Sequence, residues 1–400
     1  MAAESKQHTT GFDYLRVGLA LGVVVVHCLS IGNPAGWEAM WHSRLAPFQL
    51  FILPAFFALS GYLVAGSLFR NSIPQFAALR IARIFPALLV EVALCALVLG
   101  PLMTTVPLPV YLASTEFQSY FLNMVGSIHY TLPGVIGGRQ LNTQLWTIPF
   151  ELECYIALVA LMLVGLVRRR LLLLIGVVAA VLIMTAYAVA GAVYHVSWNV
   201  PGRMLVAAFL FGCLVYLYRD RIPHSLSLFG VSAVASYALL ASPNLVFLAA
   251  APLAYVTIYV GLLRLAPIPF GDISYGVYLF HFPIARTIHE VSGRQIGWLP
   301  LLALTTLLSG LFATVSWRCV EKPVLERKRA LLTFVDGLTL GRPLERWRLH
   351  RQRRVAHTRS LIEQGICTMC EAEPIDPFVW AQHPERPWGA QCWADQRLAP

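Results

Sequence analysis

Residues 12–31 read FDYLRVGLALGVVVVHCLSI, an apolar segment that carries Arg16 and His27 in its interior. As a helix these 20 residues would be about 30 Å long, the thickness of the hydrocarbon core of a bilayer. The segment ends without the small-residue pattern of a signal-peptidase site. We therefore expect a retained transmembrane helix.

The whole chain has the composition of a membrane protein. Of its 400 residues, 58% are hydrophobic and only 12% are charged, and the mean hydropathy is +0.66. The charged share is roughly half that of soluble proteins. So few charges cannot cover this apolar surface in water, which excludes a soluble enzyme, a disordered chain and a fibrous protein. The prediction is an all-α, polytopic bundle of transmembrane helices.

Nine further apolar segments bring the predicted number of spans to ten. They are residues 48–69, 84–103, 145–167, 171–192, 203–218, 225–241, 245–263, 273–290 and 298–319. With the N-terminus in the cytoplasm, ten Lys and Arg residues fall in cytoplasmic loops and four in external loops. This asymmetry follows the positive-inside rule and predicts that both termini are cytoplasmic. The net charge of +10 is thus explained by topology, and we expect no nucleic-acid partner.

Two regions differ from the spans. The external connection 104–144 is rich in Gly, Pro and polar residues, so it is either a lid over a substrate or a plain connector. We predict a membrane-embedded domain over residues 1–326 and a basic, Pro-containing, partly disordered cytosolic tail over 327–400. Cys367, Cys370, His383 and Cys392 in the tail fit no standard zinc-finger spacing, so no metal site is predicted.

Ionisable residues inside spans are costly and therefore indicate function. Arg16 and His27 are eleven residues apart, which places them within about 20° of one helix face and about 16 Å apart along the axis. Arg80 and Arg83 share a face at the cytosolic surface, where they are either a phosphate site or simple topological anchors.

The fourth and ninth spans carry further polar residues. Glu151 and Glu153 follow the interfacial Trp146 and lie about two turns in from the outer face, which predicts that both carboxylates line a polar cavity open to the outside. Ser274, Tyr278 and His281 fall near one face, and His281 reaches a depth similar to that of His27. We therefore predict a shared chamber with arginines on the cytosolic side, histidines at mid-depth and a carboxylate on the outer side.

Six motifs, in order along residues 10–326, resemble the acyltransferase 3 family of integral-membrane acyltransferases. They are Arg16 with His27, Phe57-Ala58-Leu59-Ser60-Gly61-Tyr62, Arg80-x-x-Arg83-Ile84-x-Pro86, Trp146-x-x-x-x-Glu151 with Tyr155, Ser274-Tyr275-Gly276-x-Tyr278-Leu279-x-His281, and Glu321-x-Pro323. Glu153 departs from the family pattern, where we expect a neutral or amide residue.

The resemblance implies transfer of an acyl group, most often acetyl, from acyl-CoA to a hydroxyl of a carbohydrate-containing acceptor. Such acceptors include lipopolysaccharide O-antigen, exopolysaccharide and glycosylated metabolites. It also implies a multi-pass location in the bacterial cytoplasmic membrane, with acyl-CoA as donor substrate and no bound cofactor.

The residues of the six motifs then take expected roles. Arg16, Arg80 and Arg83 would bind CoA, and His27 would act as general base or as a transient acyl carrier. Glu151 would orient the acceptor or a histidine. His281 and Tyr278 would stabilise the oxyanion, and Trp146 and Ser274 would line the substrate site.

Two other function classes remain open at this point. A transporter or exporter of a lipid-linked or acylated sugar would also place His27 and Glu151 inside the membrane, as a proton relay. A membrane scaffold or sensor would use residues 327–400 as its working part.

Overall fold

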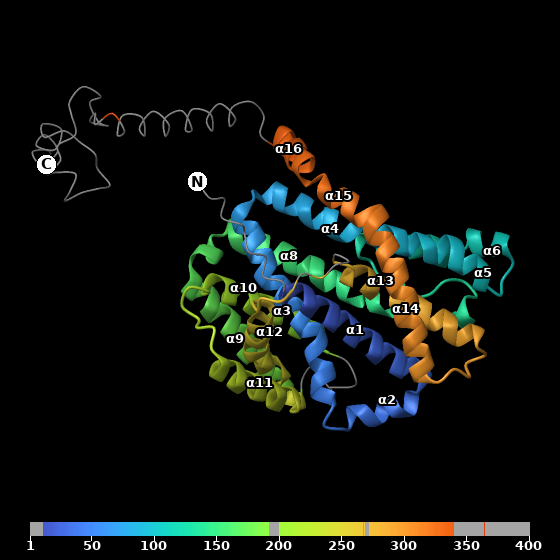
Figure 1. The fold of residues 1–400 in the computed structure, drawn as a ribbon, viewed down its shortest axis with the longest axis horizontal. Coiled ribbons are helices and arrows are strands. Elements are labelled where there is room, and N and C mark those ends of the chain that lie inside the picture. Colours follow the sequence, from blue (N-terminus) through green and yellow to red (C-terminus); the bar gives the residue numbers. More distant parts are fainter. Residues whose placement is uncertain (1–10, 192–199, 267, 269–271, 340–363, 365–400) are drawn as a thin grey trace, which may run out of the picture. The chain divides into compact units, whose positions relative to one another are not determined.

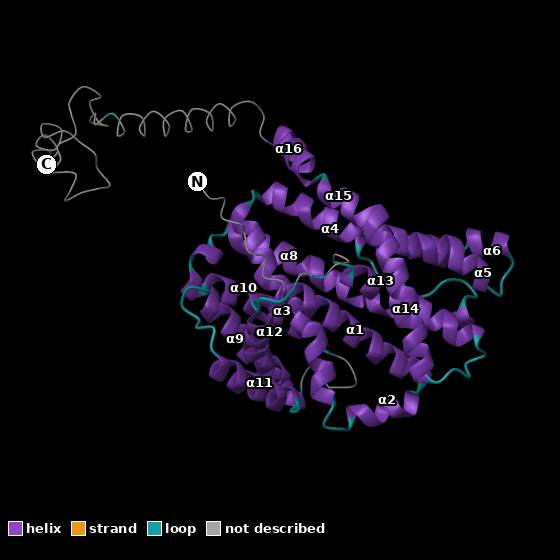
Figure 2. Cartoon of the chain, viewed as in Figure 1, coloured by secondary structure: helices purple, strands orange, loops and turns teal. Residues whose placement is uncertain are grey.

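The computed structural model describes residues 11–191, 200–266, 268, 272–339 and 364. Throughout these ranges the secondary structure is helical, without β-strands (Figures 1 and 2); Thr104 and Val135 form an isolated antiparallel bridge. The predicted all-α architecture is therefore confirmed for the described part of the chain.

Seven helical segments are long and apolar enough to cross a membrane. They are α1 (Gly11–Gly32), α3 (Ala46–Arg70), α4 with η1 and α5 (Ile73–Met103), η4 with α8 (Thr143–Leu163), α9 (Arg170–Val189), η6 with α12 (Pro243–Gly261), and α14 with η7 and α15 (Trp298–Glu326). Within them, α4 is Ile73–Leu94, α5 is Gly100–Met103, α8 is Ile148–Leu163, α12 is Ala250–Gly261, α14 is Trp298–Ser316 and α15 is Lys322–Glu326. Each matches a predicted span.

The other three predicted spans are also helices, but they differ in length or polarity. The helices α10 (Gly202–Leu217) and α11 (Leu226–Leu240) are shorter, with 16 and 15 residues. The helix α13 (Ser274–Val291) has 18 residues and carries several polar and charged side chains. A helical membrane protein follows from these elements, while ten spans and cytoplasmic termini stay predictions.

The chain divides into two compact units, Met1–Arg329 and Ala330–Pro400. The predicted domain boundary lay three residues before this division. The short helices α2 (Pro34–Trp41), α6 (Leu108–Ala113) and α7 (Thr115–Tyr120) belong to the first unit, and α16 (Lys328–Thr339) begins at its end. The tail cysteines and His383 lie outside the described residues.

Close backbone contact joins α3 to α10 in the interior of the bundle. A Cβ atom on Gly61 would lie 2.0 Å from the carbonyl oxygen of Phe209, and one on Gly212 would lie 2.0 Å from that of Ala58. Glycine is therefore required on both helices, as small residues are at close helix crossings in membranes. In Figure 1, α1 runs through the centre of this unit, and it packs against α3, α12, α13 and α14.

The connection between α5 and α8 is packed into the bundle. The Tyr111 hydroxyl donates to the carbonyl oxygen of Ala96 at 2.7 Å, and the buried Asn142 donates to the Glu91 carboxylate at 2.7 Å. The Gln144 side chain donates to the backbone oxygen of Leu279 at 2.8 Å. These bonds place the first residues of the fourth span beside the middle of α13.

Candidate active site

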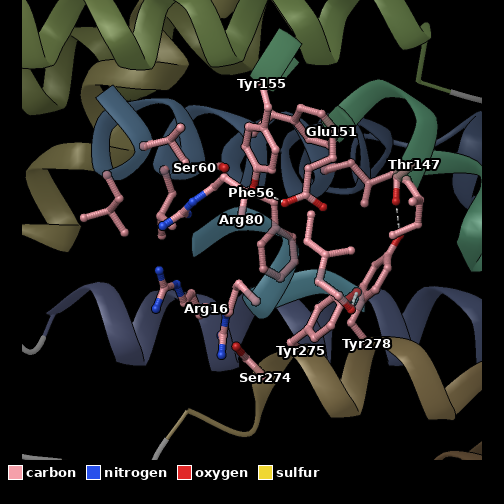
Figure 3. Close-up of a pocket in the computed structure, with 18 residues that line it drawn as sticks. Arg16, Phe56, Ser60, Arg80, Thr147, Glu151, Tyr155, Ser274, Tyr275 and Tyr278 are labelled. Carbon is pink, nitrogen blue, oxygen red and sulfur yellow. Dashed lines mark hydrogen bonds between the residues drawn. The ribbon is translucent and has the colours of Figure 1, made fainter. Parts of the chain in front are cut away.

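The candidate site consists of two cavities in the Met1–Arg329 unit. The first has a volume of about 150 Å³ and is here called the arginine cavity. Its polar lining consists of Arg16, Ser60, Arg80, Arg83, Thr147, Glu151, Tyr155, Ser274, Tyr275 and Tyr278. Figure 3 shows the labelled side chains of this group converging on one space from several helices.

The second cavity has a volume of about 240 Å³ and is here called the tryptophan cavity. Its polar and aromatic lining consists of His27, Ser30, Trp37, Trp41, Gln49, Gln140, Thr143, Trp146, Tyr278, Phe282 and Arg286. Leu53 and Tyr278 line both cavities, so these two side chains form their common wall. Along α1, Arg16 faces the arginine cavity and His27 faces the tryptophan cavity.

The partly buried His27 and the buried His281 form a pair beside this wall. His27 Nδ1 lies 2.7 Å from His281 Nε2, and the two rings are stacked with their centroids 5.0 Å apart. The predicted common depth of the two histidines is thus realised as a direct hydrogen bond. Phe282 closes the other side of His27, edge-on, at 4.9 Å between ring centroids.

Backbone carbonyls determine how protons are distributed in this pair. His281 Nδ1 lies 2.7 Å from the carbonyl oxygen of Tyr278 and must donate to it. In the neutral ring, His281 Nε2 is then an acceptor, and it receives the Nδ1–H of His27. This leaves the lone pair of His27 on Nε2, the nitrogen that is not engaged with His281.

Asp272 joins two of the three arginines. Its carboxylate accepts from Arg16 at 2.9 Å and from Arg83, and it also accepts from the Ser274 hydroxyl at 2.5 Å. Burial alone would raise the pKa of Asp272, but Arg83, Arg16 and the Ser274 hydroxyl outweigh it and hold the pKa below its ordinary value. Sequence reasoning did not assign Asp272; the signal available was an acid directly before the polar face of the ninth span.

Arg80 and Arg83 have different surroundings. Arg83 also lies 3.6 Å from the buried Glu321, which η7 (Trp317–Glu321) presents to it. The Arg80 guanidinium stacks near the rings of Phe76 and Tyr155, at 5.8 and 5.9 Å from their centroids. Among the described residues, no carboxylate oxygen lies within 4.0 Å of an Arg80 nitrogen, the limit for an ion pair. The Nε atom of Arg80 has no hydrogen-bond acceptor.

Glu151 is not where the sequence placed it. It was expected beyond the histidines, in a cavity open to the outside, but it lines the arginine cavity and accepts a hydrogen bond from Tyr155. The reason is that the fourth span begins inside the bundle, so the first turn of α8 lies beside the arginines. Glu153 pairs with Arg203 away from both cavities, which gives this acid a structural partner.

The common wall contains a small hydroxyl network. The Tyr278 hydroxyl donates to the carbonyl oxygen of Gln144 at 2.8 Å and lies 2.7 Å from the Thr147 hydroxyl. Both His281 nitrogens and the Tyr278 proton therefore already have partners within the protein. Thr147 was not assigned from the sequence, because only the packing of residues 142–147 against α13 reveals it.

The structure thus gathers all nine residues singled out from the sequence around two adjoining cavities. Arg16, Arg80, Arg83, Glu151 and Ser274 line the arginine cavity, His27 and Trp146 line the tryptophan cavity, Tyr278 lines both, and His281 lies behind His27. Trp37, Trp41 and Arg286 were missed, because their contribution depends on how α2 and the end of α13 pack.

Fold and site define a helical membrane protein with two adjoining cavities, one lined by arginines and the other by tryptophans and a histidine bonded to a buried histidine. Its sequence matches the acyltransferase domain of the acyltransferase 3 family over residues 9–318. The chain belongs to this family and is an acyltransferase.

Two curated relatives align with most of the chain. The O-acetyl transferase of Shigella phage Sf6 is 26% identical over 344 residues, which cover 81% of this chain and 98% of the relative. Nodulation protein 10 of Rhizobium leguminosarum bv. viciae is 28% identical over 372 residues, covering 82% and 96% respectively. No solved structure shows a significant match.

Replacing Asp272 by Asn should destabilise the protein, because Arg16 and Arg83 lose their shared counter-ion. We expect a loss of roughly 2–3 kcal/mol at neutral pH, measured as a lower melting temperature in detergent. Because the folded pKa of Asp272 is below the ordinary value of 3.8, this contribution is fully present above about pH 4. It disappears as the pH falls through the folded pKa, so the two proteins should converge there.

Asp13→Asn is the matched control, since Asp13 is more exposed and lies 3.8 Å from Arg16. It should change the melting temperature little. Equal melting temperatures for wild type and Asp272→Asn at neutral pH would contradict a stabilising role for Asp272.

Proposed function

We propose that the protein moves an acyl group, most often acetyl, from acyl-CoA to a hydroxyl of a carbohydrate-containing acceptor in the bacterial cytoplasmic membrane. The observation that carries this proposal is the position of His27. It is bonded to a buried histidine and stands where a cavity rich in arginine adjoins one rich in indole rings. The family membership and the O-acetyl transferase relative support the reaction type.

The arginine cavity suits the donor. CoA carries phosphates, and guanidinium groups match phosphate oxygens with paired donors. Arg80 is the cation with no carboxylate of the described residues in ion-pair reach, so it is the group best able to bind a phosphate. Asp272 holds Arg16 and Arg83 in place and offsets part of their charge. By the predicted topology this cavity opens to the cytoplasm, where acyl-CoA is found.

The tryptophan cavity suits the acceptor. Trp37, Trp41 and Trp146 offer flat apolar faces, and Gln49 and Gln140 offer amide groups. A sugar needs both, because its C–H faces are apolar and its hydroxyls require hydrogen bonds. His27 lines this cavity, so an acceptor hydroxyl bound there can approach the imidazole.

The chemical step follows from the protonation of the histidine pair. His27 Nε2 removes the proton of the acceptor hydroxyl while the hydroxyl oxygen attacks the thioester carbonyl. The tetrahedral intermediate then breaks its C–S bond, and the CoA thiolate takes the proton from the His27 imidazolium. His281 accepts the Nδ1–H of His27 throughout, which orients the ring and stabilises its cationic form. An acyl-His27 relay remains the variant mechanism.

The geometry changes three of the expected roles. Both nitrogens of His281 are occupied by His27 and by Tyr278, so we propose that His281 positions His27 and does not bind the oxyanion. Tyr278 can contact the intermediate only if substrate displaces Thr147 or Gln144 from its hydroxyl. For Glu151 we propose a role on the donor side, where it balances the charge of the arginine cavity.

Replacing His27 by Ala should abolish acyl transfer, because the hydroxyl loses its base. With membranes, radiolabelled acetyl-CoA and the glycans of the host strain, we expect the labelled acceptor to decrease by about 10²–10⁴-fold. His224→Ala is the control, since His224 is exposed and lies outside both cavities.

Wild-type membranes that never consume acetyl-CoA with any glycan fraction would contradict the proposed function. The transporter alternative predicts that outcome, together with sugar movement that depends on His27. Mass spectrometry of surface glycans from a deletion strain, searching for a lost acyl mass, would identify the acceptor.

Replacing Arg80 by Ala should weaken donor binding, because CoA loses a charge-assisted contact. We expect the KM for acetyl-CoA to rise roughly tenfold or more, with little change in the dependence of rate on acceptor. Arg70→Ala is the control, because Arg70 is an exposed arginine at the end of α3 that does not line the cavity. An unchanged KM for acetyl-CoA in Arg80→Ala would remove Arg80 from the donor site.

A further inference from the structure

Arg286 gives the tryptophan cavity a charge that the proposed reaction does not use. It lies on α13 in line with Tyr278 and Phe282, at intervals of four residues, and all three line this cavity. Its guanidinium stands over the Phe282 ring, 5.3 Å from the centroid. No step in the transfer of an acyl group to a neutral sugar requires a cation at this position.

No acidic side chain in the described part of the chain forms an ion pair with Arg286. The described lining of the tryptophan cavity contains neither Asp nor Glu. Glu290, one turn further along α13, is engaged with Arg294 through two hydrogen bonds of 3.1 and 2.9 Å. The Nε atom of Arg286 is buried and has no hydrogen-bond acceptor.

In the arginine cavity, two of the arginines have permanent acidic partners within the protein. There, Asp272 pairs with Arg16 and Arg83, and Glu321 lies beside Arg83. Arg286 is partly buried, and its buried Nε–H without an acceptor is costly unless a ligand supplies the missing partner. Arg286 therefore has the features of a ligand-binding cation.

We propose that the acceptor is an anionic sugar whose carboxylate or phosphate binds Arg286 while a nearby hydroxyl faces His27. The Arg286 guanidinium lies 5.3 Å from the centroid of the Phe282 ring, and the centroid of the His27 ring lies 4.9 Å from that of Phe282. This separation matches an acidic group and a hydroxyl on the same sugar or on adjacent sugars. The indole faces of the tryptophans that line the cavity would hold the sugar ring between Arg286 and His27. This inference rests on the proposed function, which assigns the tryptophan cavity to the acceptor. It concerns the binding of the acceptor and not the transfer of the acyl group.

The test is sugar binding to the purified full-length protein in lipid nanodiscs, without acyl donor, by titration calorimetry. The probes are methyl β-D-glucuronide, glucose 1-phosphate and methyl β-D-glucoside, which carry a carboxylate, a phosphate and no charge. Wild type should bind one anionic probe roughly tenfold or more tightly than the neutral probe. The better of the two anionic probes identifies the acidic group.

Arg286→Gln should lose this preference, and Arg286→Lys should retain most of it. Arg44→Gln is the matched control, because Arg44 is exposed and lies outside the cavity. Folding of each variant is checked by its elution in size exclusion.

Equal binding of charged and neutral probes, no binding of any probe, or an anion preference that survives in Arg286→Gln would overturn the inference. Because no acyl donor is present, the result is independent of catalysis. Selective binding without acyl transfer would contradict the proposed function alone.

Discussion

The hydrogen bond between His27 and His281 is the contact on which the proposed chemistry depends. It joins α1 to α13 beside the wall that separates the two cavities, and its direction is fixed because His281 Nδ1 must donate to a backbone carbonyl. The bond therefore leaves His27 Nε2 as the available base. A base inside a membrane must have its tautomer determined by the protein, and this chain of hydrogen bonds determines it.

Charge pairing explains the remaining polar groups. Charged side chains in a low-dielectric interior need partners, and Asp272 supplies one for Arg16 and Arg83. Arg80 and Arg286 have none among the described carboxylates, and they line different cavities. We propose that both bind ligand anions, Arg80 the donor phosphates and Arg286 the acidic group of the acceptor. Transfer then requires that the thioester and the hydroxyl meet near Tyr278, the residue that lines both cavities.

Much of the fold and part of the site could be predicted from the sequence. Apolar length alone located the helices, and the helical repeat brought Arg16 and His27 to one face and His281 to the same depth. Glu151 was misplaced because its depth depends on residues 104–142 packing into the bundle, held by Asn142 and Tyr111, which no local pattern reveals. Asp272 was missed for a related reason, since its two partners come from helices distant in sequence.

The most direct test of the account is the steady-state kinetics of acetyl transfer by His281→Leu and His281→Gln. A leucine cannot accept the Nδ1–H of His27, whereas a glutamine oxygen can. We expect His281→Leu to lower kcat on the order of 10²-fold with an unchanged KM for acetyl-CoA, and His281→Gln to recover most of the loss. Wild-type kcat in His281→Leu, or equal loss in both variants, would contradict the proposal that His281 orients His27.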